Sequence, residues 1–242
     1  MPEIPTRAVA KPGPTNVEHG YYLAAAIGIV VVVLAGFSID LPLLSHLGTL
    51  SLLVRAHGAI MLTWVAAFFT QALLVARHRV DLHMQLGMFG AVLAIVVVVA
   101  DAATLITACR LGGMHVPPGV PVPLFLAFGL FNLFTFSVLV GAALVLRKQR
   151  SEWHKRLMLL AALLLLDAAL ARFIAAYTSW NVDANVVRDL LIVGCIVVDT
   201  WRTRRLHPAF VSGGLLALAN DYVAIWAAGM PAWMRFASWV VS

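Results

Sequence analysis

Long apolar runs alternate with short polar segments along the whole chain. The runs do not alternate apolar and polar residues with the period of two that a half-buried strand requires. Runs long enough to cross the hydrocarbon core of a bilayer are typical of transmembrane helices. The pattern predicts an all-α fold, a polytopic membrane helix bundle with seven transmembrane helices, at residues 21–38, 52–76, 84–108, 122–146, 156–178, 186–201 and 209–229.

The segments outside these runs divide the chain into three parts. Residues 1–20 are predicted to form a cytoplasmic polar tail, residues 21–229 a seven-helix transmembrane domain, and residues 230–242 an interfacial amphipathic tail. Trp233 and Trp239 suit the tail's place at the lipid–water interface, where tryptophan is enriched. The segment 39–51 is too short to span and is also expected at an interface.

The composition supports a membrane protein and argues against a nucleic-acid partner. Hydrophobic residues make up 62% of the chain and charged residues 12%, whereas soluble domains carry about 25% charged residues. The formal charge of +6 comes mainly from basic residues in short loops, which is what membrane topology requires. Their uneven distribution predicts a cytoplasmic amino terminus and a carboxyl terminus on the outside of the membrane.

An internal repeat relates spans two and three to spans four and five. When residues 70–91 are laid over residues 140–161 with one residue inserted in the turn, His83 aligns with His154. The predicted topology gives both histidine-bearing helices the same direction. The two hairpins are therefore expected to be parallel repeats about an axis near the membrane normal.

The repeat also predicts a polar cluster near the outer surface. Eighteen residues make five helical turns, a rise of about 27 Å. Asp101 therefore lies on the same helix face as His83, and Arg172 on the same face as His154. Because a charge at membrane depth is costly unless it is paired, Asp101 and Arg172 are expected to face each other or to share a polar partner. His57 lies at a similar depth and would join them, either in a structural ion pair or in a substrate, quinone or ion site.

Two further aspartates, Asp167 and Asp221, lie well inside predicted spans, where Arg172 is the one basic residue expected at comparable depth. Desolvation disfavours a buried carboxylate. At least one of these carboxyl groups should therefore be protonated, should face a bound cation or a water-filled cavity, or should bond to a polar neighbour such as Asn132, Asn220 or Tyr222.

His83 and His154 lie at the inner ends of two spans, and the first copy carries the motifs A-L-L-V-A-R and L-H-M-Q-L-G after His57. Spans two to five thereby resemble the four-helix core of the cytochrome b561 group. The resemblance implies that His83 and His154 bind haem b, and that the protein exchanges electrons with quinone or a respiratory-chain protein. It departs at the second haem site of that group, because the position expected to partner His57 is Ala127.

The whole chain is similar to uncharacterised bacterial seven-span membrane proteins, which implies a place in the bacterial inner membrane. Three interpretations stay open. The first is haem-linked electron transfer, and the second is a proton- or cation-coupled carrier that uses the buried aspartates and Arg172. The third is a scaffold or assembly factor, with His83 and His154 as ordinary interfacial histidines. No catalytic motif decides whether the protein is an enzyme.

Overall fold

The computed structural model describes residues 16–38, 51–112, 116–117, 119–179 and 182–242, and every statement below concerns these residues. They contain no strand, so the all-α prediction is confirmed for them. The helices are α1 (Asn16–Phe37), α2 (Leu52–Ala76), α3 (Val80–Leu111), α4 (Val122–Leu146), α5 (Ser151–Leu164), α6 (Asp167–Tyr177), α7 (Ala184–Thr203), α8 (Pro208–Ala228) and α9 (Pro231–Val241).

The helices begin where the local sequence favours a helix start. The Ser51 hydroxyl accepts a hydrogen bond from the Val54 amide at 3.3 Å before α2, and Asp183 caps α7 by accepting from the Asn185 amide at 2.9 Å. These side chains satisfy amides that have no partner within the helix. Helix α8 begins with a proline, Pro208, whose missing amide costs nothing at that position.

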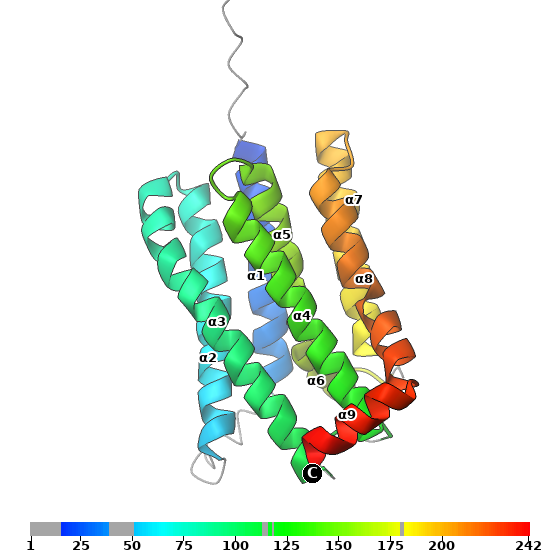
Figure 1. Ribbon diagram of the computed structural model, residues 1–242. Coiled ribbons are helices and arrows are strands. Elements are labelled where there is room, and N and C mark those ends of the chain that lie inside the picture. Colours follow the sequence, from blue (N-terminus) through cyan, green and yellow to red (C-terminus); the bar gives the residue numbers. More distant parts are fainter. Residues whose placement is uncertain (1–15, 39–50, 113–115, 118, 180–181) are drawn as a thin grey trace, which may run out of the picture.

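The helices form one bundle in which α4 is central (Figure 1). Helix α4 packs against α3, α5 and α8, while α1 packs against α2, α5 and α6. The core is therefore wider than the predicted four-helix core of spans two to five, because α1 and α8 complete it. We name as the basic end of the bundle the end that carries the exposed residues Arg77, Arg79, Arg147, Lys148 and Arg150 in its turns.

The fifth predicted span is broken. Helices α5 and α6 are separated by Leu165 and Leu166 and are bent by 47°. No proline or glycine lies there, but the Asn132 side-chain amide of α4 donates to the Leu164 carbonyl at 3.1 Å. A side chain that takes a carbonyl from the helical ladder is a recognised cause of a kink. Asn132 thus binds the carbonyl at which α5 ends.

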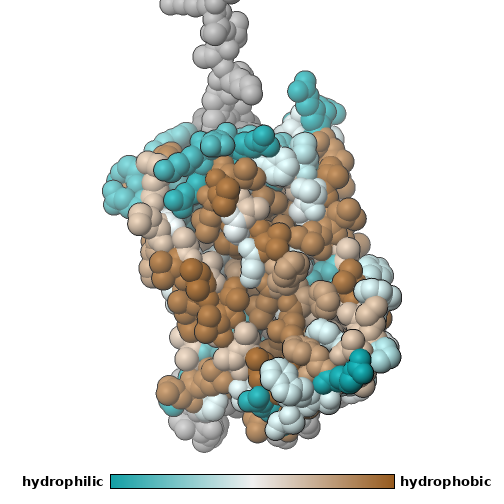
Figure 2. Space-filling model, in the orientation of Figure 1, coloured by the Kyte–Doolittle hydropathy of each residue, from teal (hydrophilic) through white to brown (hydrophobic). Residues whose placement is uncertain are grey.

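The number of membrane spans differs from the prediction. Among the described residues, α1, α2, α3, α4 and α8 are long and apolar enough to cross a membrane, and α5 with α6 makes a sixth span if the bent pair counts as one. Seven spans are not confirmed, because α7 carries too many charged residues to qualify. Figure 2 shows hydrophobic side chains along the middle of the bundle and hydrophilic ones at the basic end, an arrangement compatible with an integral membrane protein.

The expected parallel repeat is not confirmed either. Both hairpins are present, since α2 packs against α3 and α4 packs against α5. Helix α3 is continuous over 32 residues, however, whereas its counterpart ends at Leu164 and resumes in a new direction at Asp167. The equivalence of the two hairpins is therefore limited to the parts that precede this break.

The carboxyl-terminal segment forms α9, which lies across the end of the bundle opposite the basic end (Figure 1). The Trp233 indole donates to the Pro123 carbonyl at 2.9 Å, and the Arg110 guanidinium donates to the Val240 carbonyl at 2.8 Å. These bonds attach α9 to the beginning of α4 and the end of α3. Trp239 is 71% exposed and stays on the outer face of the helix.

Helices α1 and α6 approach each other at Gly36. A β-carbon there would overlap the backbone carbonyl of Ala169. Small residues allow membrane helices this close approach, which gains van der Waals contact. The crossing of α1 and α6 therefore depends on a glycine at this position.

We expect Gly36→Ala to lower the thermal stability of the detergent-solubilised protein, because overpacking of a core contact costs about 1–3 kcal/mol. The matched control is Gly28→Ala on the same helix, where no atom lies within 4 Å of the added carbon. Thermal unfolding followed by circular dichroism measures both. Equal stability of the two variants would contradict the close contact.

Candidate functional site

His83 and His154, which the resemblance to the cytochrome b561 group implied as a pair of ligands, lie next to each other at the basic end. His83 is in the first turn of α3 and His154 in the first turn of α5. Their ring centroids are 6.3 Å apart and their planes meet at 80°. The two side chains come from different hairpins, so the packing of the hairpins and not the local chain brings them together.

Two tight turns fix the starts of these helices. Between α2 and α3, His78 adopts a positive φ of 57° and the Arg79 amide donates to the Leu74 carbonyl at 2.8 Å. Between α4 and α5, the Arg150 amide donates to the Leu146 carbonyl at 2.8 Å. Each turn reverses the chain within a few residues. Each histidine is thereby placed as the fourth residue of its helix.

The two imidazoles have different hydrogen bonding. His154 Nδ1 lies 2.9 Å from the Ala143 carbonyl oxygen. Since a carbonyl only accepts, this bond places the proton on Nδ1 and leaves the Nε2 lone pair available. His83 Nδ1 is buried and has no hydrogen-bond partner. His154 is thus oriented as a ligand would be, whereas His83 has an unsatisfied nitrogen.

Space remains beside the His83 face of α3. Gly87 and Gly90 follow His83 at one and two turns. A β-carbon at Gly90 would have no atom within 4 Å, and one at Gly87 would meet only the Gln71 side-chain nitrogen, at 3.7 Å. Glycines on this face leave room for a flat group that approaches the helix backbone.

A second polar site surrounds Arg188 of α7, a residue with no exposed surface. Its guanidinium forms ion pairs with Asp167 of α6 at 2.9 Å, Asp189 of α7 at 2.8 Å and Asp221 of α8 at 2.7 Å. Three carboxylates therefore share one cation. If all three are ionised, two negative charges remain uncompensated by this guanidinium. We call these four residues the Arg188 network.

Neutral polar groups extend this network into the bundle. The Asn132 amide donates to Asp167 at 3.2 Å, and the Asn220 amide donates to Asp221 at 3.1 Å. The Thr135 hydroxyl in turn donates to the Asn220 side-chain oxygen at 2.9 Å. These asparagines are two of the neighbours expected from the sequence. The same Asn132 side chain binds the carbonyl at which α5 ends, so the network and the kink form one structural unit.

Of the remaining members of the predicted polar cluster, His57 and Asp101 lie close together but Arg172 does not join them. His57 Nδ1 lies 3.8 Å from the Asp101 carboxylate, as their similar depth suggested. Arg172 is not at this site, since its guanidinium donates to the Ala168 carbonyl at 3.1 Å and lies 4.6 Å from the centre of the Phe37 ring. The helix break before Arg172 invalidates the five-turn spacing from His154. The expected pairing of Asp101 with Arg172 is therefore not made.

The sequence analysis missed the partner of Asp167 and Asp221. Arg188 lies near the start of the predicted span 186–201, and only Arg172 was expected at the depth of these aspartates. The available signal was the excess of carboxylates, which required another cation at comparable depth.

A further buried ion pair lies at the basic end and was also missed. Arg156 of α5 donates to both carboxylate oxygens of Asp199 of α7, at 2.9 Å and 3.1 Å, and both residues are 2% exposed. Arg156 also donates to the Glu152 carboxylate at 2.7 Å. Helix α7 is therefore held by buried arginine–aspartate pairs near both of its ends.

His207 stands beside this pair and caps α8. Its Nδ1 accepts a hydrogen bond from the Ala209 amide at 3.1 Å, and its ring packs against Trp153. Burial lowers the pKa of His207, and the neighbouring Arg156 guanidinium lowers it further. Only an unprotonated Nδ1 can accept the capping bond, so the lowered pKa and the cap favour the same form of the ring.

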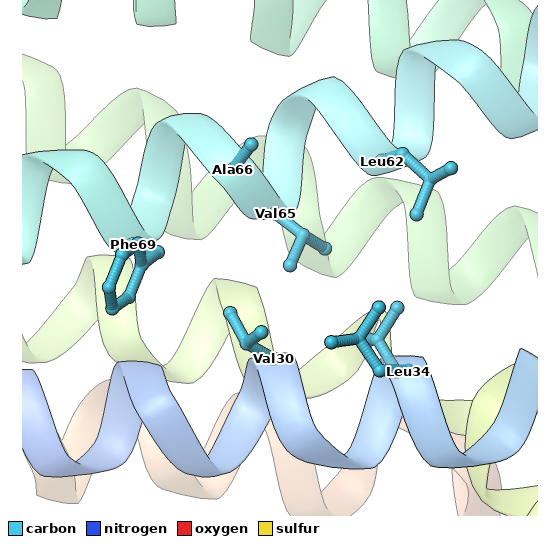
Figure 3. A pocket seen from close by; sticks show the side chains of 7 residues that line it. Val30, Leu34, Leu62, Val65, Ala66 and Phe69 are labelled. Carbon is cyan, nitrogen blue, oxygen red and sulfur yellow. The ribbon is translucent and has the colours of Figure 1, made fainter.

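A cleft of about 250 Å³ lies between α1 and α2. Its lining is apolar, and Figure 3 shows Val30 of α1 and Val65 of α2 pointing toward one another across it. These side chains carry no polar or ionisable group. The cleft therefore suits the hydrocarbon chain of a lipid-soluble molecule.

In the described part of the chain, no three histidine, cysteine, aspartate or glutamate side chains are grouped so as to hold a metal ion. A zinc site takes at least three protein ligands, so His83 and His154 alone do not make one. No family model, curated protein or solved structure matches the chain.

We expect Arg156→Leu to destabilise the protein by about 3–5 kcal/mol, because it leaves the buried Asp199 carboxylate without its arginine. Asp199→Leu should cost less, because Arg156 keeps its ion pair with Glu152. The double variant should cost less than the sum, since it removes both charges. Denaturant unfolding of the four proteins in one detergent measures this coupling. Additive losses would show that the two side chains do not interact.

Proposed function

We propose that the chain is a membrane electron-transfer protein that holds haem b between His83 and His154. The observation that carries the proposal is the apposition of the two imidazoles, 6.3 Å apart, from α3 and α5. Imidazole nitrogens bind metal ions at about 2.0–2.1 Å, which places two rings on opposite sides of one ion with their centroids about 6 Å apart. An angle of 80° between the planes is compatible with this, because each plane can contain the common axis.

The surroundings of the two rings support the proposal. The Ala143 carbonyl holds His154 with Nδ1 protonated, which directs Nε2 to a ligand. The glycines beside His83 leave space that a bound group would fill. Haem, when bound, supplies reversible one-electron chemistry. The protein residues would hold it, set its axial ligands and shield it from water.

The electron partner and the location belong to the same proposal. We propose quinone as the partner, since it dissolves in the bilayer and the apolar cleft between α1 and α2 suits its tail. We also propose that the protein lies in a bacterial inner membrane with the basic end toward the cytoplasm. Exposed arginine and lysine residues in the turns of that end support this orientation.

We expect purified protein from haem-sufficient cells to show a reducible Soret band. His83→Ala and His154→Ala should each abolish it, because haem b then loses an axial ligand. His57→Ala is the matched control and should keep the band, since His57 lies near the other end of α2, 3.8 Å from the Asp101 carboxylate. Absorbance spectra before and after dithionite measure the result. A haem-free wild-type preparation would overturn the proposal.

A second candidate function is a proton- or cation-coupled carrier. It is favoured by the Arg188 network at a broken membrane helix. Discontinuous helices with charged groups at the break are typical of transporter binding sites, and buried ionisable groups mark proton and ion paths. The excess of two carboxylates supplies groups that could take up a proton or a cation.

If the network carries protons, Asp167→Asn should reduce proton flux into proteoliposomes to that of protein-free vesicles, because the amide no longer exchanges a proton. Asp81→Asn is the control, since Asp81 is exposed at the basic end. A pH-sensitive dye inside the vesicles, with an imposed membrane potential, measures the flux. Equal flux through Asp167→Asn and the wild type would exclude this role for Asp167.

A further inference from the structure

Two buried polar atoms without partners lie on adjacent helices beside the candidate haem site. They are His83 Nδ1 on α3 and the side-chain oxygen Gln71 Oε1 on α2. The Gln71 amide lies against the His83 face of α3, since its nitrogen would be 3.7 Å from a β-carbon at Gly87, one turn beyond His83. One atom is a potential donor and the other an acceptor.

A histidine that binds a metal through Nε2 carries its proton on Nδ1 and donates it to an acceptor, which fixes the ring and raises its basicity. His154 already has such an acceptor in the Ala143 carbonyl. His83 Nδ1 makes no hydrogen bond in this structure, although the Gln71 backbone lies close enough to interact with the ring. The two histidines would therefore be unequally prepared as ligands unless a neighbouring group accepts from His83.

We propose that Gln71 is the positioning residue of His83. Its side-chain oxygen accepts the hydrogen bond from Nδ1 when Nε2 binds haem iron, and this inference rests on the proposed haem site. The bond satisfies both buried atoms at once and gives His83 the orientation that Ala143 gives His154.

The neighbouring polar side chains do not offer the same acceptor. Trp64 Nε1, on the same face of α2 and also buried without a partner, is a donor only. The Asp81 carboxylate is exposed and pairs with Arg79 at 3.4 Å. His57 is paired with Asp101 near the other end of α2. Gln71 is thus the acceptor that the packing of α2 on α3 supplies.

The test compares Gln71→Leu, Gln71→Glu and the wild type by titration of haem-depleted full-length protein with haem b and by redox potentiometry. Loss of an outer partner typically weakens metal binding about 10- to 100-fold, and we expect this for Gln71→Leu. The leucine variant should also have a higher midpoint potential than the wild type, because its imidazole donates less electron density. The glutamate variant should have a lower one. Opposite shifts report a hydrogen bond to the ligand, whereas a packing role would not give opposite signs.

Gln85→Leu is the control, because Gln85 is exposed on the same helix as His83 and its loss should leave both quantities unchanged. If the wild type binds haem and the Gln71 variants keep its affinity and potential, this inference alone is overturned. Potentials that shift in the same direction in both variants overturn it too. A wild type that binds no haem overturns the proposed function and this inference with it.

Discussion

The need to pair every charge that leaves water governs this structure. In hydrocarbon an isolated guanidinium or carboxylate is far more costly than one with a hydrogen-bonded counter-ion. Arg188 meets this need with three aspartates from α6, α7 and α8, and Arg156 meets it with Asp199 and Glu152. Both arginines bind partners that are distant in the chain. The ion pairs therefore fix which helices lie beside α7, and apolar packing fills the remaining space.

The two candidate sites lie in different parts of the bundle and differ in kind. The histidine pair joins α3 to α5 at the basic end through two neutral rings, whereas the Arg188 network joins α6, α7 and α8 through charges. The histidines leave ligand atoms available, and the network has nearly all of its polar atoms bonded. This contrast is the reason for assigning cofactor binding to the first site. The second site combines a structural role with an excess of negative charge.

Helix positions could be predicted closely from the sequence, because the length and separation of apolar runs depend on local chemistry alone. The apposition of His83 and His154 was also predictable, since both precede the helix break and follow matching turns. The place of Arg172 was not, because the helix breaks after Leu164, where Asn132 of another helix binds the carbonyl. The role of Arg188 was missed for a related reason. Its counter-ions lie on three helices, and hydropathy does not reveal which helices meet.

The polar character of α7 has a consequence for how the protein is made. A helix with Arg188, Asp189, Asp199 and Arg202 in its sequence is costly to place in lipid before its counter-ions are present. Its partners are on α5, α6 and α8, and α8 is synthesised later. Release of α7 into the lipid would therefore be delayed until Asp221 has been synthesised. Helices α6, α7 and α8 would then enter the lipid together. Biogenesis of this end of the chain is then cooperative across three helices, unlike the independent insertion available to α2 or α4.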